Sequence, residues 1–153
     1  MTNISLEQIQ KLREVCGAGV MECRNALNET GGDEKKALEV LKKKGRDIAE
    51  KKKEREVKSG LIEAYSHAGG KVVAVVELLC ETDFVARNEQ FKALAHELAM
   101  QVAAMKPKDV EELLKQEYIR EATKTVGDLL NELIGKIKEN IQVGRIARFE
   151  LGE

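Results

Sequence analysis

The stretch LIEAYSHAGGKVVAVVELL (residues 61–79) decides the fold. Two runs rich in β-branched and aliphatic residues, 61–66 and 71–79, flank the tetrapeptide His67-Ala68-Gly69-Gly70. Such runs on both sides of a glycine-containing turn predict a β-hairpin. The second run contains VVAVVELL, which is too short to span a membrane and predicts a strand buried on both faces.

The tripeptide Gly69-Gly70-Lys71 also resembles the end of a phosphate-binding loop. Val72, however, stands where such a loop has the Ser or Thr that holds magnesium, and Tyr65 stands where its first glycine belongs, with no glycine at Ala64 either. We therefore interpret the tripeptide as a hairpin turn. The sequence predicts no bound nucleotide and no cofactor.

Three short helices are predicted before the hairpin. The first begins with a capping box opened by Ser5 and is ended by the glycines of residues 17–19. The second covers residues 20–29, and Asp33 is the expected N-cap of the third. Gly45 is expected to close the third helix, because glycine readily adopts the left-handed conformation that follows a helix.

Residues 46–58 predict an exposed helical linker, since they contain few apolar side chains. The wider segment 42–58 holds nine Lys or Arg residues and four Asp or Glu residues, a local balance of +5. Such a segment has two interpretations, a solvated helix face or a phosphate-contacting surface. No aromatic side chain is present for base stacking, which favours the solvated face.

Beyond the hairpin, residues 91–102 have apolar side chains at helical spacing, and Pro107 stops that helix. Asp109 and Thr125 have the positions of N-caps for two further helices. Residues 145–151 alternate between polar and apolar side chains and predict a final strand that pairs with the hairpin.

The predicted fold class is α+β. It comprises a three-helix module (1–45) that resembles ubiquitin-associated domains, a basic helical linker (46–58) and an α+β core (59–153). The core is expected to hold an antiparallel sheet of about three strands packed with helices.

The composition is that of a folded, soluble protein with a net charge close to zero. The chain has 153 residues, 35% charged and 42% hydrophobic, with a net charge of −1. This balance gives no electrostatic signal for nucleic acid, and no apolar run predicts a membrane segment. The N-terminal residues lack the features of a signal peptide, and three cysteines without a C-x-x-C pair fit a reducing compartment. We expect a cytoplasmic protein without a metal site.

Phe84 stands where the strand pattern breaks, within TDFVARN (residues 82–88). One interpretation is a core side chain that closes the end of the sheet. The other is a side chain aimed at a partner, because the neighbours Thr82, Asp83, Arg87 and Asn88 are polar. The residues alone leave these interpretations equal.

Val20 and Met21 follow the glycine turn of the helical module, where small bundles often contact partners. For Val20 a core position is equally compatible, whereas exposure is favoured for Met21, since a flexible thioether suits an adaptable interface. His67 and His96 lack a nearby nucleophile or metal-ligating partner and are interpreted as structural. Glu81 and Asp83 are neighbouring carboxylates, but nothing in the sequence marks them as a general acid–base pair. We therefore expect no enzymatic active site.

Four segments of the chain resemble the bacterial elongation factor Ts family. They are LREVCGAGVMECRNAL (12–27), TDFVARN (82–88), KTVGDLL (124–130) and GRIARFELGE (144–153), and they occur in the family's order. The second is the most specific. The chain is shorter than the long members of the family, which have two related core subdomains and a coiled-coil insertion.

The resemblance implies a guanine nucleotide exchange factor for elongation factor Tu, which is not an enzyme in its own right. It implies that Thr82, Asp83, Phe84 and Val85 insert near the magnesium and phosphate site of the partner's GTPase domain. It also implies that the N-terminal module touches that domain, at positions matching Arg13, Val20 and Met21. With a single core subdomain, the resemblance implies a homodimer, with no membrane and no direct nucleic-acid contact.

Two other functions are open on the sequence. A ubiquitin-associated-like adaptor would bind a protein partner without catalysing exchange, and its affinity for that partner would not depend on bound nucleotide. An RNA-binding protein acting through residues 42–58 would show a steep dependence of affinity on salt.

Overall fold

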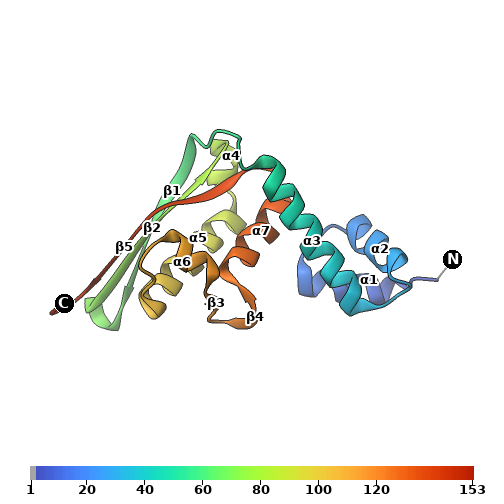
Figure 1. Ribbon diagram of the computed structural model, residues 1–153, viewed down its shortest axis with the longest axis horizontal. Helices are drawn as coiled ribbons and strands as arrows, with labels where there is room; N and C mark the ends of the chain where they lie inside the picture. The colour runs from blue at the N-terminus through green and yellow to red at the C-terminus, as the bar shows by residue number, and fades with distance from the viewer. Residues whose placement is uncertain (1–2) are drawn as a thin grey trace.

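The computed structural model describes residues 3–153. A helical module lies at one end of the molecule, and a mixed core of helices and strands lies at the other (Figure 1). The α+β class and the order of elements predicted from the sequence are confirmed. The module contains three helices: α1 (Leu6–Cys16), α2 (Val20–Glu29) and α3 (Glu34–Lys52).

The predicted helix starts are confirmed by side-chain caps. Ser5 Oγ accepts from the Gln8 amide at 3.2 Å, and Gln8 Oε1 accepts from the Ser5 amide at 3.0 Å. Asp33 accepts from the Lys36 amide at 3.0 Å. These bonds satisfy amides that have no partner within the first turn of a helix, so each helix starts where the sequence places it.

The prediction that the third helix closes at Gly45 is wrong. α3 runs without a break to Lys52, and Gly45 is buried in its middle. The apolar side chains of Ile48 and Ala49 pack against the core, which the prediction of an exposed linker missed. Glycine is tolerated inside this helix because its missing side chain allows another helix to come close.

A three-stranded antiparallel sheet forms one side of the core, in the order β1-β2-β5. The hairpin and the final strand are therefore confirmed, and the glycine-rich tripeptide lies in its turn, Ala68–Gly70. The final strand begins earlier than predicted. The strands are β1 (Ser59–His67), β2 (Val72–Cys80) and β5 (Ile141–Glu150).

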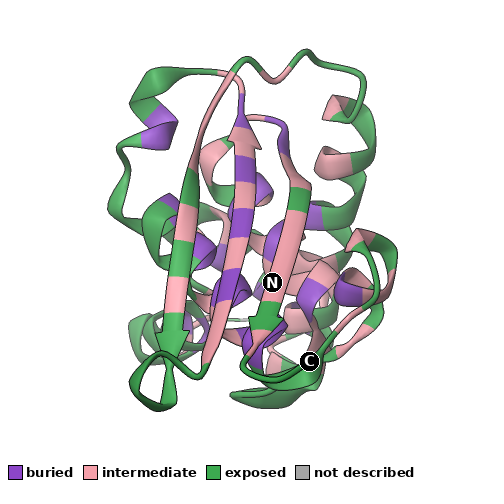
Figure 2. Ribbon diagram, turned by 90° about the vertical axis from the view of Figure 1, so that its left-hand side faces the viewer, coloured by how far each residue is buried: buried purple, intermediate pink, exposed green. Residues whose placement is uncertain are grey.

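The prediction that β2 is buried on both faces is also wrong. Ala74, Val76 and Leu78 are fully buried, whereas the residues between them are only partly covered. Figure 2 views the sheet from the partly covered side, where β2 alternates between buried and intermediate residues. Helices that follow β2 in the chain cover the opposite face (Figure 1). The run is therefore apolar on both sides, although helices pack on only one side.

The helices behind the sheet complete the core. Phe91, Leu98 and Leu113 are fully or almost fully buried against the inward side chains of β2. A two-stranded sheet of β3 and β4 lies beyond them and was missed by the sequence analysis, because its strands are short and polar. The elements are α4 (Asp83–Ala86), α5 (Glu89–Met105), α6 (Val110–Lys115), β3 (Glu117–Tyr118), β4 (Glu121–Thr125) and α7 (Val126–Ile137).

Candidate functional site

Phe84 projects from the molecule on a short helix. Phe84 is 89% exposed, whereas the next two residues, Val85 and Ala86, are only 9% and 8% exposed. The interpretation of Phe84 as a core side chain is therefore wrong. Val85 is part of the core and anchors the segment from within. A large exposed ring held by two buried neighbours is an unusual arrangement for a side chain with only a structural role.

Thr82 fixes the start of this helix. Its hydroxyl accepts from the Val85 amide at 3.4 Å, as an N-cap, and its carbonyl oxygen accepts from the Cys80 thiol at 3.2 Å. Burial, assisted by the negative charge of Glu139, raises the pKa of Cys80 to about 11, so this thiol keeps the proton that it donates. The backbone that carries Phe84 is thus tied to the end of β2.

Asp83 lies beside Phe84 on the surface. Its carboxylate pairs with Arg87 at 3.1 Å, and both side chains are more than two-thirds exposed. An ion pair in water contributes little to stability. The carboxylate is therefore available to exchange its partner for another cation or hydrogen-bond donor.

Val20 and Met21 form a second exposed apolar surface at the start of α2. They are 46% and 59% exposed, so both lie outside the core of the module. Arg13 is exposed on α1, and its carbonyl oxygen accepts from the Gly17 amide at 2.6 Å. The left-handed conformation of Gly17, at φ 65°, turns the chain between the two helices.

In Figure 1, α4 lies near the C-terminal end of α3, and α2 lies beside that helix on its other side. With 19 residues, this helix spans about 28 Å at 1.5 Å per residue. α3 crosses α7 where Gly45 meets Gly135, and an alanine methyl at Gly135 would lie 3.4 Å from the Gly45 Cα. Lys138 Nζ also reaches Glu22 Oε1 of α2 at 3.1 Å. The module is therefore packed on the core.

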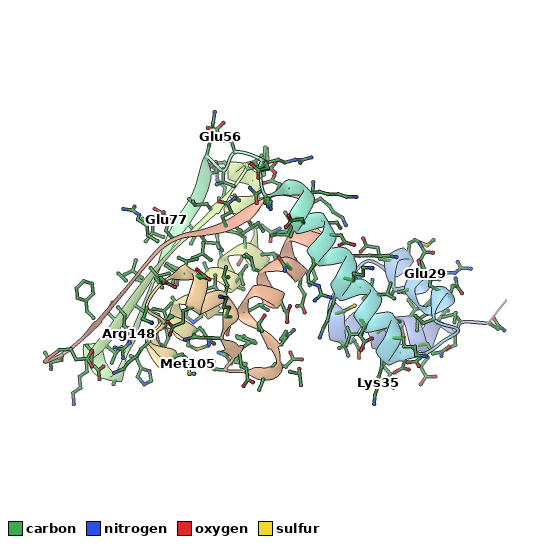
Figure 3. The ribbon with its side chains drawn as sticks, viewed as in Figure 1. Glu29, Lys35, Glu56, Glu77, Met105 and Arg148 are labelled. Carbon is green, nitrogen blue, oxygen red and sulfur yellow. The ribbon has the colours of Figure 1, made fainter. Side chains whose placement is uncertain are left out.

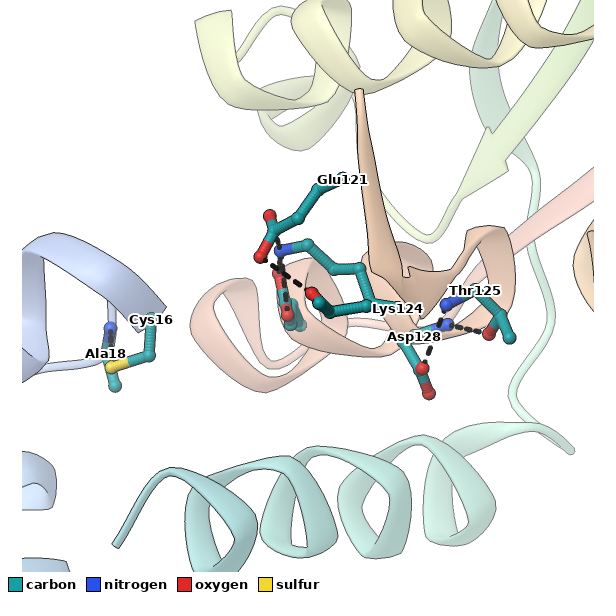
Figure 4. Close-up of polar contacts among 8 residues, drawn as sticks. Cys16, Ala18, Glu121, Lys124, Thr125 and Asp128 are labelled. Carbon is teal, nitrogen blue, oxygen red and sulfur yellow. Dashed lines mark hydrogen bonds and ion pairs between the residues drawn. The ribbon is translucent and has the colours of Figure 1, made fainter. Parts of the chain in front are cut away.

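A narrow cleft lies between the module and α7. Its lining includes Cys16 and Ala18 on one side and Asp128 and Glu132 on the other. Figure 4 shows Cys16 and Ala18 facing this part of the core across the cleft. Burial lowers the pKa of the nearby Lys124, but the carboxylates of Glu132 and Glu121 outweigh burial and leave that pKa raised. These charges are satisfied within the chain and hold β4 on α7.

Both histidines lie beside other polar side chains of the chain. Tyr65 and His67 share a hydrogen bond of 3.1 Å, and His96 lies 3.3 Å from Glu63, so both histidines have partners on the surface of β1. Between residues 3 and 153, no group of three or more His, Cys, Asp or Glu side chains converges as metal ligands do. No helix in that range has the length and apolar character needed to cross a membrane.

What the site offers is protein recognition. Exposed apolar side chains on well-fixed supports are typical of contact residues at interfaces. The sequence analysis named the residues of both surfaces. It missed Glu139, whose carboxylate accepts hydrogen bonds from Thr82 across a separation of 57 residues, because no local pattern signals such a contact.

A sequence model described as Elongation factor TS matches residues 81–153 of the chain. The matched part begins immediately before Thr82 and includes α4 and the sheet strand β5.

Curated relatives match over almost the whole chain, and each carries the name Elongation factor Ts. A protein of Thermotoga petrophila is 44% identical over 193 positions, which cover 98% of this chain and 97% of the relative. A protein of Caldanaerobacter subterraneus subsp. tengcongensis is 40% identical, with 98% of each chain covered. A protein of Desulforamulus reducens is 37% identical, with 100% of this chain and 91% of the relative covered.

These relatives are longer within the aligned span. The 193 positions aligned with the Thermotoga petrophila protein exceed the 153 residues of this chain by 40. At least that many residues of the relative therefore have no counterpart here.

Proposed function

The chain belongs to the elongation factor Ts family, and from this premise we propose that it promotes guanine nucleotide exchange on elongation factor Tu. In this role it acts in the cytoplasm during the elongation phase of protein synthesis. It speeds the release of GDP so that GTP can load. It makes and breaks no covalent bond and needs no cofactor.

The observation that carries the proposal is the exposure of Phe84 on a fixed turn. Thr82 caps the turn, and Val85 is buried beneath it, so the ring is held outward before any partner arrives. A rigid aromatic side chain that fills a pocket is typical of the residues that dominate an interface. We propose that Phe84 is the wedge that enters the GTPase domain of the partner.

Exchange by a wedge follows from linkage. If the ring packs only where the partner has opened around its magnesium and phosphate site, this protein binds the nucleotide-free partner more tightly than the loaded one. Nucleotide affinity then falls by the same factor when this protein is bound. Asp83 stands beside the ring with an exposed carboxylate, and we propose that it approaches the polar groups around the magnesium ion.

The N-terminal module supplies the second contact. Val20 and Met21 are exposed together, and Arg13 adds a positive charge on α1. Two contacts held by one packed body reinforce each other, because the second forms at a high effective concentration once the first has formed. We propose that these three residues grip the GTPase domain while Phe84 acts at the nucleotide site.

A homodimer is proposed through the partly covered face of the sheet. Phe149 and Ile62 are 70% and 64% exposed there. Val73, directly opposite Phe149 in the register, adds to the apolar surface. The charged Glu77, drawn on the side of the sheet away from the helices in Figure 3, pairs with Arg145 at 2.8 Å. The face is therefore apolar and internally neutral, which suits a second copy of itself.

The exchange proposal is tested by the release of a fluorescent GDP analogue from elongation factor Tu. We expect the protein to accelerate release, and we expect Phe84→Ala to weaken productive binding by about 2–4 kcal/mol, the range for residues that dominate an interface. The fold should survive, because an exposed side chain contributes little to stability.

Three outcomes separate the candidate functions. Acceleration that falls in Phe84→Ala supports both the exchange function and the wedge. Acceleration that the substitution leaves unchanged removes the wedge and moves the mechanism to the module. No acceleration by the wild type, with binding that ignores bound nucleotide, would instead identify an adaptor.

A further inference from the structure

Glu139 lies in the connection between α7 and β5 and contacts the turn that carries Phe84. It follows α7 directly and is partly buried. Its Oε1 accepts from the Glu81 amide at 3.1 Å and from the Thr82 amide at 3.0 Å. Its Oε2 accepts from the Thr82 hydroxyl at 2.7 Å. One carboxylate therefore receives three hydrogen bonds from the two residues that precede α4.

The turn needs such a support. α4 has four residues, and a helix of one turn has almost no stability of its own. Hydrogen bonds to a carboxylate are about twice as strong as bonds between neutral groups. The direction of the Phe84 ring therefore depends on how firmly the backbone at Thr82 is fixed, and Glu139 accepts the hydrogen bonds that both the amide and the hydroxyl of Thr82 donate.

The next residue connects the same region to the end of α3. The Asn140 amide donates to Glu81 Oε1 at 2.9 Å, and Asn140 Nδ2 donates to the Arg55 carbonyl oxygen at 2.6 Å. Asn140 is 2% exposed. Since it satisfies buried backbone groups, Asn140 supports the fold, whereas the contacts of Glu139 are confined to the turn.

We infer that Glu139 is a positioning residue for nucleotide exchange, acting through Thr82 to hold Phe84 in its outward direction. The inference rests on the proposed function and deepens it. Without the carboxylate, the turn samples other conformations, and only a fraction of molecules present the ring correctly. The apparent affinity for the partner then falls by that fraction, while the bound complex stays competent.

The test measures GDP release from elongation factor Tu over a range of concentrations of the wild type, Glu139→Ala and Glu139→Gln. For Glu139→Ala we expect the half-maximal concentration to rise about tenfold, equivalent to ~1.4 kcal/mol, which is close to one hydrogen bond to a charged group. The maximal rate should stay near that of the wild type. Glu139→Gln keeps one acceptor oxygen and should lie between the two.

The control is Glu111→Gln, which removes the same charge from an exposed ion pair with Lys115 on α6. It should leave both the half-maximal concentration and the maximal rate unchanged. Thermal unfolding and circular dichroism of each variant establish that it is folded. Amide hydrogen exchange at Thr82 should quicken in Glu139→Ala and stay slow in the control.

The outcomes distinguish this inference from the proposed function. If the wild type does not accelerate release, the proposed function fails, and the exchange rate of the Thr82 amide still tests the positioning. If the wild type accelerates release and a folded Glu139→Ala matches it at all concentrations, the positioning role is overturned. It is also overturned if the Thr82 amide is equally protected in both proteins.

Discussion

Replacing Gly45 by valine should separate α3 from α7. Gly45 is buried where the two helices cross, and a Cβ atom added there would lie 3.2 Å from the Asn131 carbonyl oxygen. An alanine methyl needs the neighbouring backbone to shift by a few tenths of an ångström. Its strain is opposed by a gain in helix propensity of about 1 kcal/mol over glycine, so Gly45→Ala should change stability little.

Valine adds two more methyl groups in the same restricted space. Overpacking of this kind costs about 1–3 kcal/mol, and valine has a lower helix propensity than alanine. The contacts of Ile48 and Ala49 with the core lie within the next turn of α3 and weaken as the helices move apart. We expect Gly45→Val to lose about 2–3 kcal/mol of stability relative to Gly45→Ala, a fall of about 4–12 °C in melting temperature at this chain length.

Thermal and urea unfolding, followed by circular dichroism, measure both differences. Lys43→Val on the exposed side of α3 is the control, because it introduces a β-branched side chain without a facing helix. Its loss should stay near half a kilocalorie per mole, roughly the propensity difference between the two residues. If Gly45→Val melts within a degree of Gly45→Ala, the close crossing of α3 and α7 does not limit the side chain, and the reasoning is refuted.

Three further perturbations probe other parts of the molecule. Phe149→Lys should convert a dimer to a monomer in sedimentation equilibrium without loss of the fold, and a wild type that is monomeric at all concentrations would contradict the proposed interface. Hydrogen bonds from Lys106 first, then from a neighbouring arginine, lower the pKa of Glu150 from 4.5 to about 2. The stability difference between wild type and Glu150→Gln should therefore be fully present above pH 4.5 and disappear as the pH falls to 2. A stability difference independent of pH would contradict this role of Glu150. Burial raises the pKa of Cys23 to about 12. Iodoacetamide at pH 8 should therefore modify this thiol only after the protein unfolds, as peptide mass mapping can detect. Rapid labelling of Cys23 in the native protein would show that the thiol is accessible.

The sequence was sufficient wherever structure depends on neighbouring residues. The caps at Ser5, Asp33 and Thr125 were predicted because a side chain three residues from an amide can reach it. The hairpin was predicted because glycine interrupts two runs of strand-forming residues. TDFVARN was predicted to be a contact segment from its resemblance to the elongation factor Ts family, whereas the residues alone left the direction of the Phe84 ring undecided.

Sequence reasoning failed where the outcome depends on distant parts of the chain. Gly45 has the local character of a helix end, yet α3 continues because Gly135 of α7 accepts a close approach there. β2 is apolar on both faces, but the number of helices available to cover it is a property of the whole fold. No local pattern distinguishes Glu139, because its hydrogen bonds to Thr82 form only when the ends of β2 and α7 come together.

The same long-range contacts explain how binding energy alone can drive the proposed exchange. Binding energy opens a partner only if little of it is spent on ordering the binder itself. Here the turn of Phe84 is held by the carboxylate of Glu139, and the surface of Met21 is carried on a helix pair packed against the core. Both surfaces are thus fixed in advance by contacts within the chain. In the proposed mechanism, the free energy of association is then available to stabilise the open, nucleotide-free form of elongation factor Tu.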